Sequence, residues 1–189
     1  MKKNKISKNW IHRQNRDIYV RESKIQGYRS RSAFKLIEID QKFRFLSKSR
    51  FLLDLGSAPG SWSQVASKKI KKGKILSVDI KEMLPINNTK FLKGDFTQLE
   101  TQNKIMKFFN LKINAVLSDM APNTTGNKEL DSFRTGNLCL NALEFSRKIL
   151  KVNACFVSKI FMGAVFKEIQ IRAKEIFKEV LIFKPKSSR

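Results

Sequence analysis

Short apolar runs alternate with amphipathic stretches along most of the chain. The apolar runs are rich in Leu, Ile, Val and Phe and span four to eight residues, which is typical of buried strands. They predict six strands, within residues 50–56, 74–80, 90–96, 113–123, 154–161 and 179–186. Apolar residues at helical spacing predict five helices, within residues 27–40, 61–70, 101–109, 136–150 and 164–177.

The alternation of strands and helices predicts the fold class. Strands separated by helices pair in parallel through right-handed crossovers. We therefore expect an α/β fold with a doubly wound, mostly parallel sheet and helices on both faces. Ligands of such sheets bind at the carboxyl ends of the strands.

The first 24 residues differ in composition from the rest. They hold eight Lys or Arg residues against Asp17 and Glu22, with few large apolar residues. This pattern predicts a basic N-terminal arm over residues 1–24, ordered weakly or only on a partner, followed by one domain over residues 25–189. A total of 189 residues suits a single domain.

The whole chain is strongly basic. It has 39 Lys and Arg against 16 Asp and Glu, a net charge of +23 and an isoelectric point near 10.3. An A+T-rich genome explains abundant lysine but not this surplus of positive charge, so the charge favours a nucleic-acid partner. With 41% hydrophobic residues, the chain is too apolar to be disordered.

The sequence gives little support for a membrane-spanning segment, a signal peptide or a metal site. Lys159 interrupts the most apolar stretch, "ACFVSKIFMGAVF", and the basic N-terminus lacks the apolar segment of a signal peptide, so we expect a cytoplasmic protein. Cys139 and Cys155 lie in apolar surroundings and His12 is the only histidine. We expect no metal.

The stretch "DLGSAPGSW", residues 54–62, follows an apolar run and predicts a glycine-bearing turn between a strand and a helix. It lacks both the G-x-G-x-x-G spacing that binds a pyrophosphate and the Gly-Lys-Ser/Thr of a P-loop. A ligand that carries adenosine without phosphate fits this loop. S-adenosylmethionine is the abundant ligand of that kind.

Three aspartates lie at the carboxyl ends of three of the predicted strands. Asp79 is placed to accept hydrogen bonds from ribose hydroxyls, Asp95 to bind an adenine amino group, and Asp119 to lie near a cationic sulfonium or ammonium. Any one of them is as well explained as a turn former or helix cap. Three together, with Asp54 and the glycine loop, favour a ligand site.

Lys159 interrupts an apolar strand at the expected ligand edge of the sheet. In a lysine-rich chain it is equally well read as one more surface lysine. The functional hypothesis is that burial and a nearby cation, Lys35, favour the neutral amine, which then acts as a base on a sugar hydroxyl while Asp119 orients it.

These motifs together resemble a known family. "GYRSRSAFKL", "DLGSAPGSWSQV", "GDF", "SDMAPN", "SKIF" and "KPKSSR", in this order and spacing, resemble the FtsJ/RrmJ (RlmE) family of ribosomal RNA large-subunit 2′-O-ribose methyltransferases, from about residue 15 onward. The resemblance implies a Rossmann-like, class I S-adenosylmethionine-dependent methyltransferase. It also implies methylation of the 2′-oxygen of a uridine in 23S rRNA of the large ribosomal subunit.

The resemblance implies a role for individual residues. Lys35, Asp119 and Lys159 match three members of the family's Lys-Asp-Lys-Glu catalytic set, with Lys159 as proton acceptor. Arg29, Arg31, Lys35 and the N-terminal arm would contact RNA phosphates. The residues expected to contact the cofactor are Gly60, Trp62, Asp79, Asp95 and Asp119.

Two departures from the family pattern stand out. The family's glutamate, and the closing strand it begins, would follow Ser187-Ser188-Arg189, where the sequence stops. We therefore expect a C-terminal truncation, which an intact mass of 21.9 kDa for the native protein would refute. Ser61 replaces a more usual glycine, which is tolerable if residue 61 does not need a positive φ.

Other functions compete with this hypothesis. A non-catalytic RNA-binding factor for ribosome assembly could keep a methyltransferase shape, and cofactor binding without methyl transfer would favour it. Related enzymes act on tRNA or on mRNA caps. An NAD-linked dehydrogenase is disfavoured by the spacing of the glycine loop. A monomer is the simplest expectation for the oligomeric state.

Overall fold

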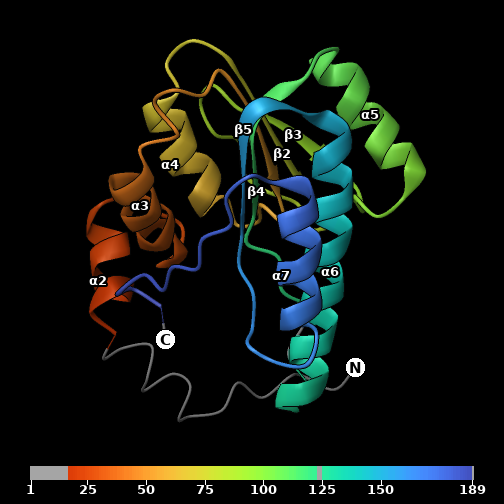
Figure 1. Cartoon of the computed structure of the whole chain (residues 1–189). Coiled ribbons are helices and arrows are strands. Elements are labelled where there is room, and N and C mark those ends of the chain that lie inside the picture. The colour runs from red at the N-terminus through yellow and green to blue at the C-terminus, as the bar shows by residue number, and fades with distance from the viewer. Residues whose placement is uncertain (1–16, 123–124, 189) are drawn as a thin grey trace, which may run out of the picture.

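The computed structural model describes residues 17–122 and 125–188. Its centre is a sheet of five parallel strands in the order β3-β2-β1-β4-β5, as the doubly wound pattern predicts (Figure 1). Starting from β1, the chain extends the sheet in one direction through β2 and β3, and then in the other direction through β4 and β5. In doubly wound sheets the ligand crevice lies where the strand order reverses, which here is at the carboxyl ends of β1 and β4. The strands are β1 Phe51–Leu55, β2 Lys74–Asp79, β3 Lys90–Lys93, β4 Ile113–Ser118 and β5 Leu150–Ser158.

Helices cover both faces of the sheet. In Figure 1, α3 and α4 lie on one side of the strands, and α5, α6 and α7 lie on the other, while α2 stands beside α3. The helices are α2 Ile18–Ile25, α3 Ser32–Phe43, α4 Ser61–Lys69, α5 Leu99–Phe109, α6 Lys128–Ile149 and α7 Phe166–Ile176.

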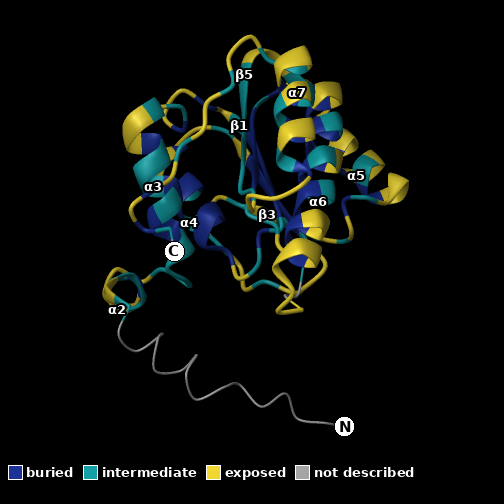
Figure 2. Cartoon of the chain, turned by 60° about the horizontal axis from the view of Figure 1, so that its bottom comes forward, coloured by how far each residue is buried: buried dark blue, intermediate teal, exposed yellow. Residues whose placement is uncertain are grey.

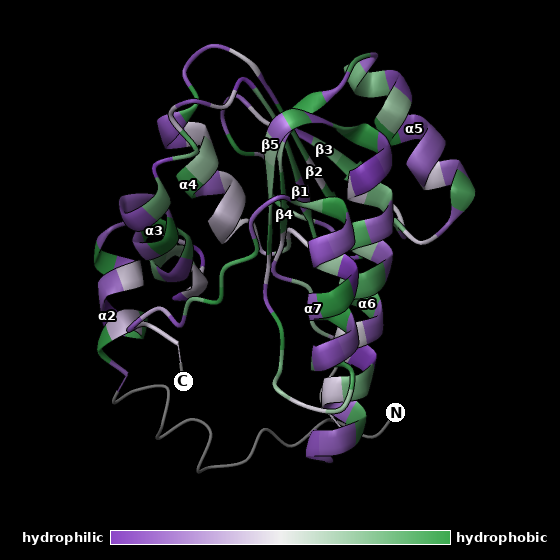
Figure 3. Cartoon of the chain, in the orientation of Figure 1, coloured by the Kyte–Doolittle hydropathy of each residue, from purple (hydrophilic) through white to green (hydrophobic). Residues whose placement is uncertain are grey.

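The alternation of side chains along β1 divides the core in two. Leu52 packs with the buried residues of α3 and α4, whereas Leu53 and Leu55 pack with α5 and α6. Phe145 of α6 is 1% exposed and is among the largest fully buried side chains. Figure 2 shows the centre of the sheet buried and the outer faces of the helices exposed, whereas the edge strand β5 is partly exposed. Figure 3 shows hydrophilic and hydrophobic residues alternating along α6 and α7.

The strand expected within residues 179–186 does not form, and this prediction was wrong. In the described chain, residues 178–186 pair with no strand and run past α3 instead, with the Phe183 ring 5.8 Å from the Phe43 ring. The Glu38 carboxylate accepts hydrogen bonds from the backbone N–H groups of Lys186 and Ser187. An apolar run becomes a strand only where a neighbouring strand supplies hydrogen-bond partners.

The structure contains one helix that the sequence did not predict, α2, and one that is longer than predicted, α6. Residues 18–25 form α2, which overlaps the expected basic arm over residues 18–24, because the Asp17 carboxylate accepts the Tyr19 N–H and caps the helix. The rest of that arm, residues 1–16, lies outside the described residues, as does His12. Helix α6 begins eight residues early because Asn127 caps it by accepting the N–H groups of Glu129 and Leu130.

The described part of the chain contains no helix long and apolar enough to cross a membrane. Its cysteine, aspartate and glutamate side chains form no group of three or more that could hold a metal ion. Cys139 is buried, Cys155 is half-buried, and both are free thiols.

Candidate active site at the carboxyl ends of β1, β4 and β5

The glycine loop joins β1 to α4 and lies against the end of β2. The backbone N–H groups of Gly56 and Ser57 donate to the Val78 carbonyl at 2.9 and 3.2 Å. Gly56 has a φ of +70°, and a Cβ placed on it would lie 2.2 Å from Cγ of Met120. Only glycine therefore allows the loop to approach the segment that follows β4.

Asp54 lies fully buried beneath this loop. Its Oδ2 accepts a 2.5 Å hydrogen bond from Ser63 Oγ, which is also 2.6 Å from Ser77 Oγ. Its Oδ1 has no hydrogen-bond partner within the described residues. Burial raises the pKa of Asp54 to about 7, the Ser63 hydrogen bond opposes this rise, and the charges of Asp119 and Asp79 add to it.

Asp79 stands at the end of β2 and connects two loops. Its Oδ2 accepts the Ala58 N–H of the glycine loop at 2.9 Å, and its Oδ1 accepts the Lys81 N–H at 2.8 Å. A carboxylate has about four lone-pair sites, so both oxygens keep capacity for a ligand's hydroxyl groups. Asp79 thus shapes the glycine loop as well as being placed for a ligand.

Asp95 lies two residues beyond the end of β3 and is exposed. Its Oδ1 accepts hydrogen bonds from the Thr97 N–H at 2.9 Å and from Thr97 Oγ1 at 2.7 Å. This is the turn-forming geometry that competes with ligand binding for an isolated aspartate. Because both bonds go to Oδ1, the position also leaves Oδ2 open to a ligand.

Lys159, Asp119 and Lys35 meet at the ends of β4, β5 and α3. Lys159 Nζ lies 2.9 Å from Asp119 Oδ1 and donates a 3.0 Å hydrogen bond to the Asp119 backbone carbonyl. Lys35 Nζ lies 3.9 Å from the same Oδ1. The Lys159 and Asp119 side chains are only 20% and 16% exposed, so this is a partly desolvated cluster rather than a surface ion pair.

A small cavity connects this cluster to the glycine loop. Its volume is about 160 Å³, less than the ~300 Å³ of a small complete ligand site, so it suits one part of a larger molecule. Trp62 forms part of the wall and is 3% exposed, with its indole N–H donating to the Ser32 carbonyl. The cavity is lined by Ser30, Ser32, Gly56, Ser57, Ala58, Pro59, Ser61, Trp62 and Asp119.

Gly60 is the N-cap residue of α4 and has a φ of +113°. A Cβ there would lie 2.6 Å from an Arg29 nitrogen and 2.8 Å from Met83 Sδ, so these side chains cover the outer side of the loop. The next residue, Ser61, is not among the described residues with positive φ, and its Oγ lies 2.8 Å from Ser30 Oγ. Serine is therefore compatible with that position.

The two arginines expected to contact RNA both make contacts within the protein. The Arg29 guanidinium donates to three backbone carbonyls, those of Pro59, Leu84 and Pro85. Arg31 pairs with Asp17 and donates to the Ser187 carbonyl, which ties α2 and the C-terminal segment to the start of α3. Spacing along the sequence does not reveal these long-range contacts.

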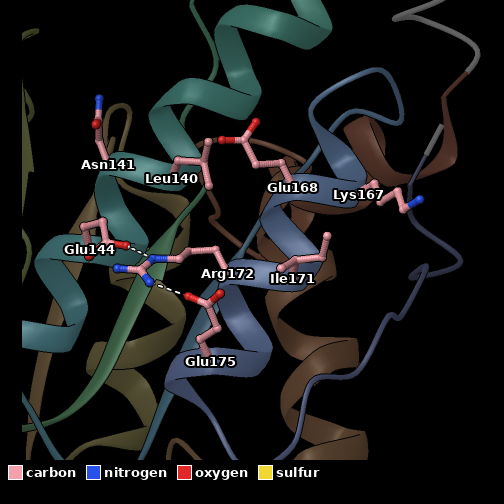
Figure 4. Close-up of a pocket in the computed structure, with 8 residues that line it drawn as sticks. All are labelled: Leu140, Asn141, Glu144, Lys167, Glu168, Ile171, Arg172 and Glu175. Carbon is pink, nitrogen blue, oxygen red and sulfur yellow. Dashed lines mark hydrogen bonds and ion pairs between the residues drawn. The ribbon is translucent and has the colours of Figure 1, made fainter.

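A larger hollow of about 660 Å³ lies between α6 and α7 (Figure 4). Arg172 there pairs with Glu144 and Glu175, which flank it on the two helices. The hollow lies on the outer helical layer and includes none of the residues predicted for the site. Its ion pairs are half-exposed, and the one between Arg172 and Glu144 joins α7 to α6.

Ser63 and Met120 were not among the predicted site residues. Ser63 carries the hydrogen bond to Asp54, and its position in the first turn of α4 is the only signal that the sequence offers. Met120 lies inside the "SDMAPN" stretch, whose last residue, Asn123, is outside the described residues. Its close approach to Gly56 could not be anticipated without the fold.

Comparisons with known proteins agree with this geometry. A model of the FtsJ-like methyltransferase family matches residues 28–189. A ribosomal RNA large subunit methyltransferase E from Pelagibacter ubique is 54% identical over 189 residues, covering 100% of this chain and 93% of that protein. The protein of the same name from Rickettsia akari is 46% identical, covering 97% of this chain and 83% of that protein.

A solved structure is also similar. The crystal structure of a protein from Plasmodium falciparum, described as a ribosomal RNA methyltransferase, superimposes with a TM-score of 0.78 at 34% sequence identity. The match covers 85% of this chain and 93% of that chain.

Proposed function

Because the chain belongs to the FtsJ-like methyltransferase family, we propose that it transfers a methyl group from S-adenosylmethionine to the 2′-oxygen of a uridine in 23S rRNA of the large ribosomal subunit. The observation that carries this proposal is the position of Asp119 Oδ1, 2.9 Å from Lys159 and 3.9 Å from Lys35, in the cavity that reaches the glycine loop. The substrate places this reaction in the cytoplasm.

The buried polar atoms near the loop fit such a cofactor. Ser57 Oγ and Asp54 Oδ1 are buried and have no hydrogen-bond partner within the described residues. The charges of Asp119 and Asp79 both help to raise the pKa of Asp54, so negative charge gathers here in a chain of net charge +23. A cofactor with a cationic sulfonium and ammonium complements that charge.

Five residues would hold the cofactor. Asp79 would accept the ribose hydroxyls on its remaining lone pairs, and Asp95 would accept the adenine amino group on Oδ2. Asp119 would lie near the cationic end, Gly60 would keep the loop close to the ligand, and Trp62 would form the wall of the cavity. When bound, the cofactor supplies an electrophilic methyl group and a neutral thioether as leaving group.

Lys159 acts as the base in this proposal. Its neutral amine accepts the proton of the 2′-hydroxyl as the oxygen forms its bond to the methyl carbon. The resulting ammonium is stabilised by Asp119, whose side chain and backbone carbonyl fix the position of Nζ. Lys35 stabilises the negative charge that develops on the 2′-oxygen, and alignment of the reacting atoms contributes much of the rate.

RNA phosphates would be contacted beside this cluster. Arg29, Arg31 and Lys35 all lie in or just before α3, and the positive charge of the chain attracts the RNA. Lys35 is the strongest candidate because it already lies in the catalytic cluster. Arg29 binds protein carbonyls through part of its guanidinium group, so it would use its remaining N–H groups. Arg31 pairs with Asp17 and donates to the Ser187 carbonyl, so it would contribute its positive charge.

The base assignment is tested by Lys159→Ala. We expect the methyl-transfer rate to fall by about 10²- to 10⁴-fold, the usual contribution of general base catalysis, with cofactor affinity changed less than threefold. The assay is single-turnover transfer to large ribosomal subunits, with calorimetry for the cofactor. Lys167→Ala, on the exposed side of α7, is the matched control. An equal loss of cofactor affinity and rate would contradict the role of Lys159.

A further inference from the structure

Arg29 bridges two loops at the edge of the proposed cofactor site. One guanidinium nitrogen donates to the Pro59 carbonyl at 2.9 Å and to the Leu84 carbonyl at 2.8 Å. The other donates to the Pro85 carbonyl at 2.8 Å. The side chain thus connects the glycine loop to the segment between β2 and β3, two stretches that are far apart in the sequence.

The same side chain covers Gly60. A Cβ at Gly60 would lie 2.6 Å from Arg29 Nη1, 2.8 Å from Ile86 Cδ1 and 2.8 Å from Met83 Sδ. Arg29 and residues 83–86 therefore pack together on the outer side of the glycine loop. The loop has no room to move outward while these contacts persist.

The backbone of Arg29 is also held in place. Its N–H donates to Gln64 Oε1 at 2.9 Å, and Gln64 Nε2 donates to the Gly27 carbonyl at 3.0 Å. Gln64 belongs to α4, the helix that the glycine loop begins. The segment that carries Arg29 is thus anchored to the element whose start it restrains.

We propose that Arg29 is a positioning residue, which holds the segment after β2 against the glycine loop and thereby sets the affinity for the cofactor. This inference rests on the proposed function, because it concerns the same site. Asp79, our candidate for the ribose hydroxyls, lies at the start of that segment and binds Ala58 of the glycine loop. The glycine loop and the segment after β2, which form two edges of the site, are therefore held in a fixed position relative to each other.

The planar guanidinium is essential to this role. Its donors diverge in one plane and reach three carbonyls at once, whereas a lysine ammonium is a single point charge on a flexible stem. Lysine keeps the positive charge that an RNA phosphate senses. Arg29→Lys therefore separates a structural role from a purely electrostatic one.

The experiment measures two affinities for Arg29→Lys. We expect the affinity for S-adenosylmethionine, measured by calorimetry, to fall about tenfold, as the loss of one or two net hydrogen bonds implies. The affinity for an rRNA fragment without cofactor, measured at two salt concentrations, should change less than twofold. Arg147→Lys, at an exposed position in the last turn of α6, is the matched control and should alter neither.

A second readout does not depend on the cofactor. Backbone hydrogen exchange of the cofactor-free protein should accelerate at least fivefold in residues 57–61 and 82–88 of Arg29→Lys, with α7 unchanged as internal reference. Unchanged exchange would overturn the inference, as would unchanged cofactor affinity with weakened RNA binding. A wild-type protein that binds no S-adenosylmethionine would refute the proposed function instead, while the exchange result would still decide the role of Arg29.

Discussion

Asp54 makes the stability of this protein depend on pH in a calculable way. The carboxyl group is fully buried, and burial raises its pKa to about 7 despite the hydrogen bond from Ser63. In the unfolded chain its pKa is close to 4. Between these two values the unfolded state loses the proton and the folded state keeps it, so stability falls as pH rises from about 4 to about 7 and then levels.

The size of the stability loss follows from the difference between the two pKa values of Asp54. Three pH units at 1.36 kcal/mol each give a total loss of ~4 kcal/mol, of which about 3 kcal/mol falls between pH 5 and pH 8. Asn at position 54 cannot ionise, but its side-chain oxygen can still accept the Ser63 hydrogen bond. The free energy of unfolding of Asp54→Asn, relative to wild type, should therefore rise by about 3 kcal/mol from pH 5 to pH 8.

Urea denaturation at five pH values measures this difference. Titration of all other groups is common to both proteins and cancels, and any constant penalty from the new amide does not affect the slope. Asn141→Ser, at an exposed position with no ionisable side chain, should show a difference that is constant with pH. A difference for Asp54→Asn that is also constant, within about 0.5 kcal/mol, would refute the reasoning from burial.

Two further substitutions test the packing of the sheet. Phe145→Ala removes a side chain that is 1% exposed in the core beneath α6, and urea denaturation should show a loss of about 3–5 kcal/mol; a loss below ~1 kcal/mol would mean that the core collapses to fill the space. Gly73→Ala would place a Cβ 1.8 Å from the Arg50 carbonyl oxygen, and we expect a loss of about 1–3 kcal/mol by the same method; an unchanged midpoint would contradict the close approach of the two segments.

The sheet could be predicted because its strands have a recognisable sequence pattern. The stretches that became β1, β2 and β4 are short and apolar, and each ends at or just before a glycine or an aspartate, so both their existence and their carboxyl ends were evident. The end of each strand carried the functional information, since Asp79 and Asp119 lie there. The parallel order then brought these residues to one edge of the sheet.

The strand expected within residues 179–186 shows the limit of such patterns. Its apolar residues resemble those of β5, but Phe183 packs on α3 instead. An apolar pattern indicates that side chains will be covered, and it does not specify which element covers them. Hydrogen bonds to Glu38 then satisfy the backbone without a strand.

The chemistry of the site was only partly evident from the sequence. The aspartates and Lys159 could be identified by position, and the structure brings Lys35, Asp119 and Lys159 together. The contacts of Arg29 could not be foreseen, because residue 29 and residues 84–85 come together only through the fold. A basic residue near a site is compatible with RNA binding and with loop support until its hydrogen bonds are known.

The most direct test of the account is transfer of radiolabelled methyl from S-adenosylmethionine to large ribosomal subunits that lack ribose methylation. Free rRNA and tRNA serve as competing substrates, and Lys159→Ala serves as the inactive control. We predict label on the subunit's 23S rRNA, at a 2′-oxygen of uridine, with little on tRNA and almost none with the variant. Cofactor binding without label on any RNA, or label that persists in Lys159→Ala, would contradict the central claim.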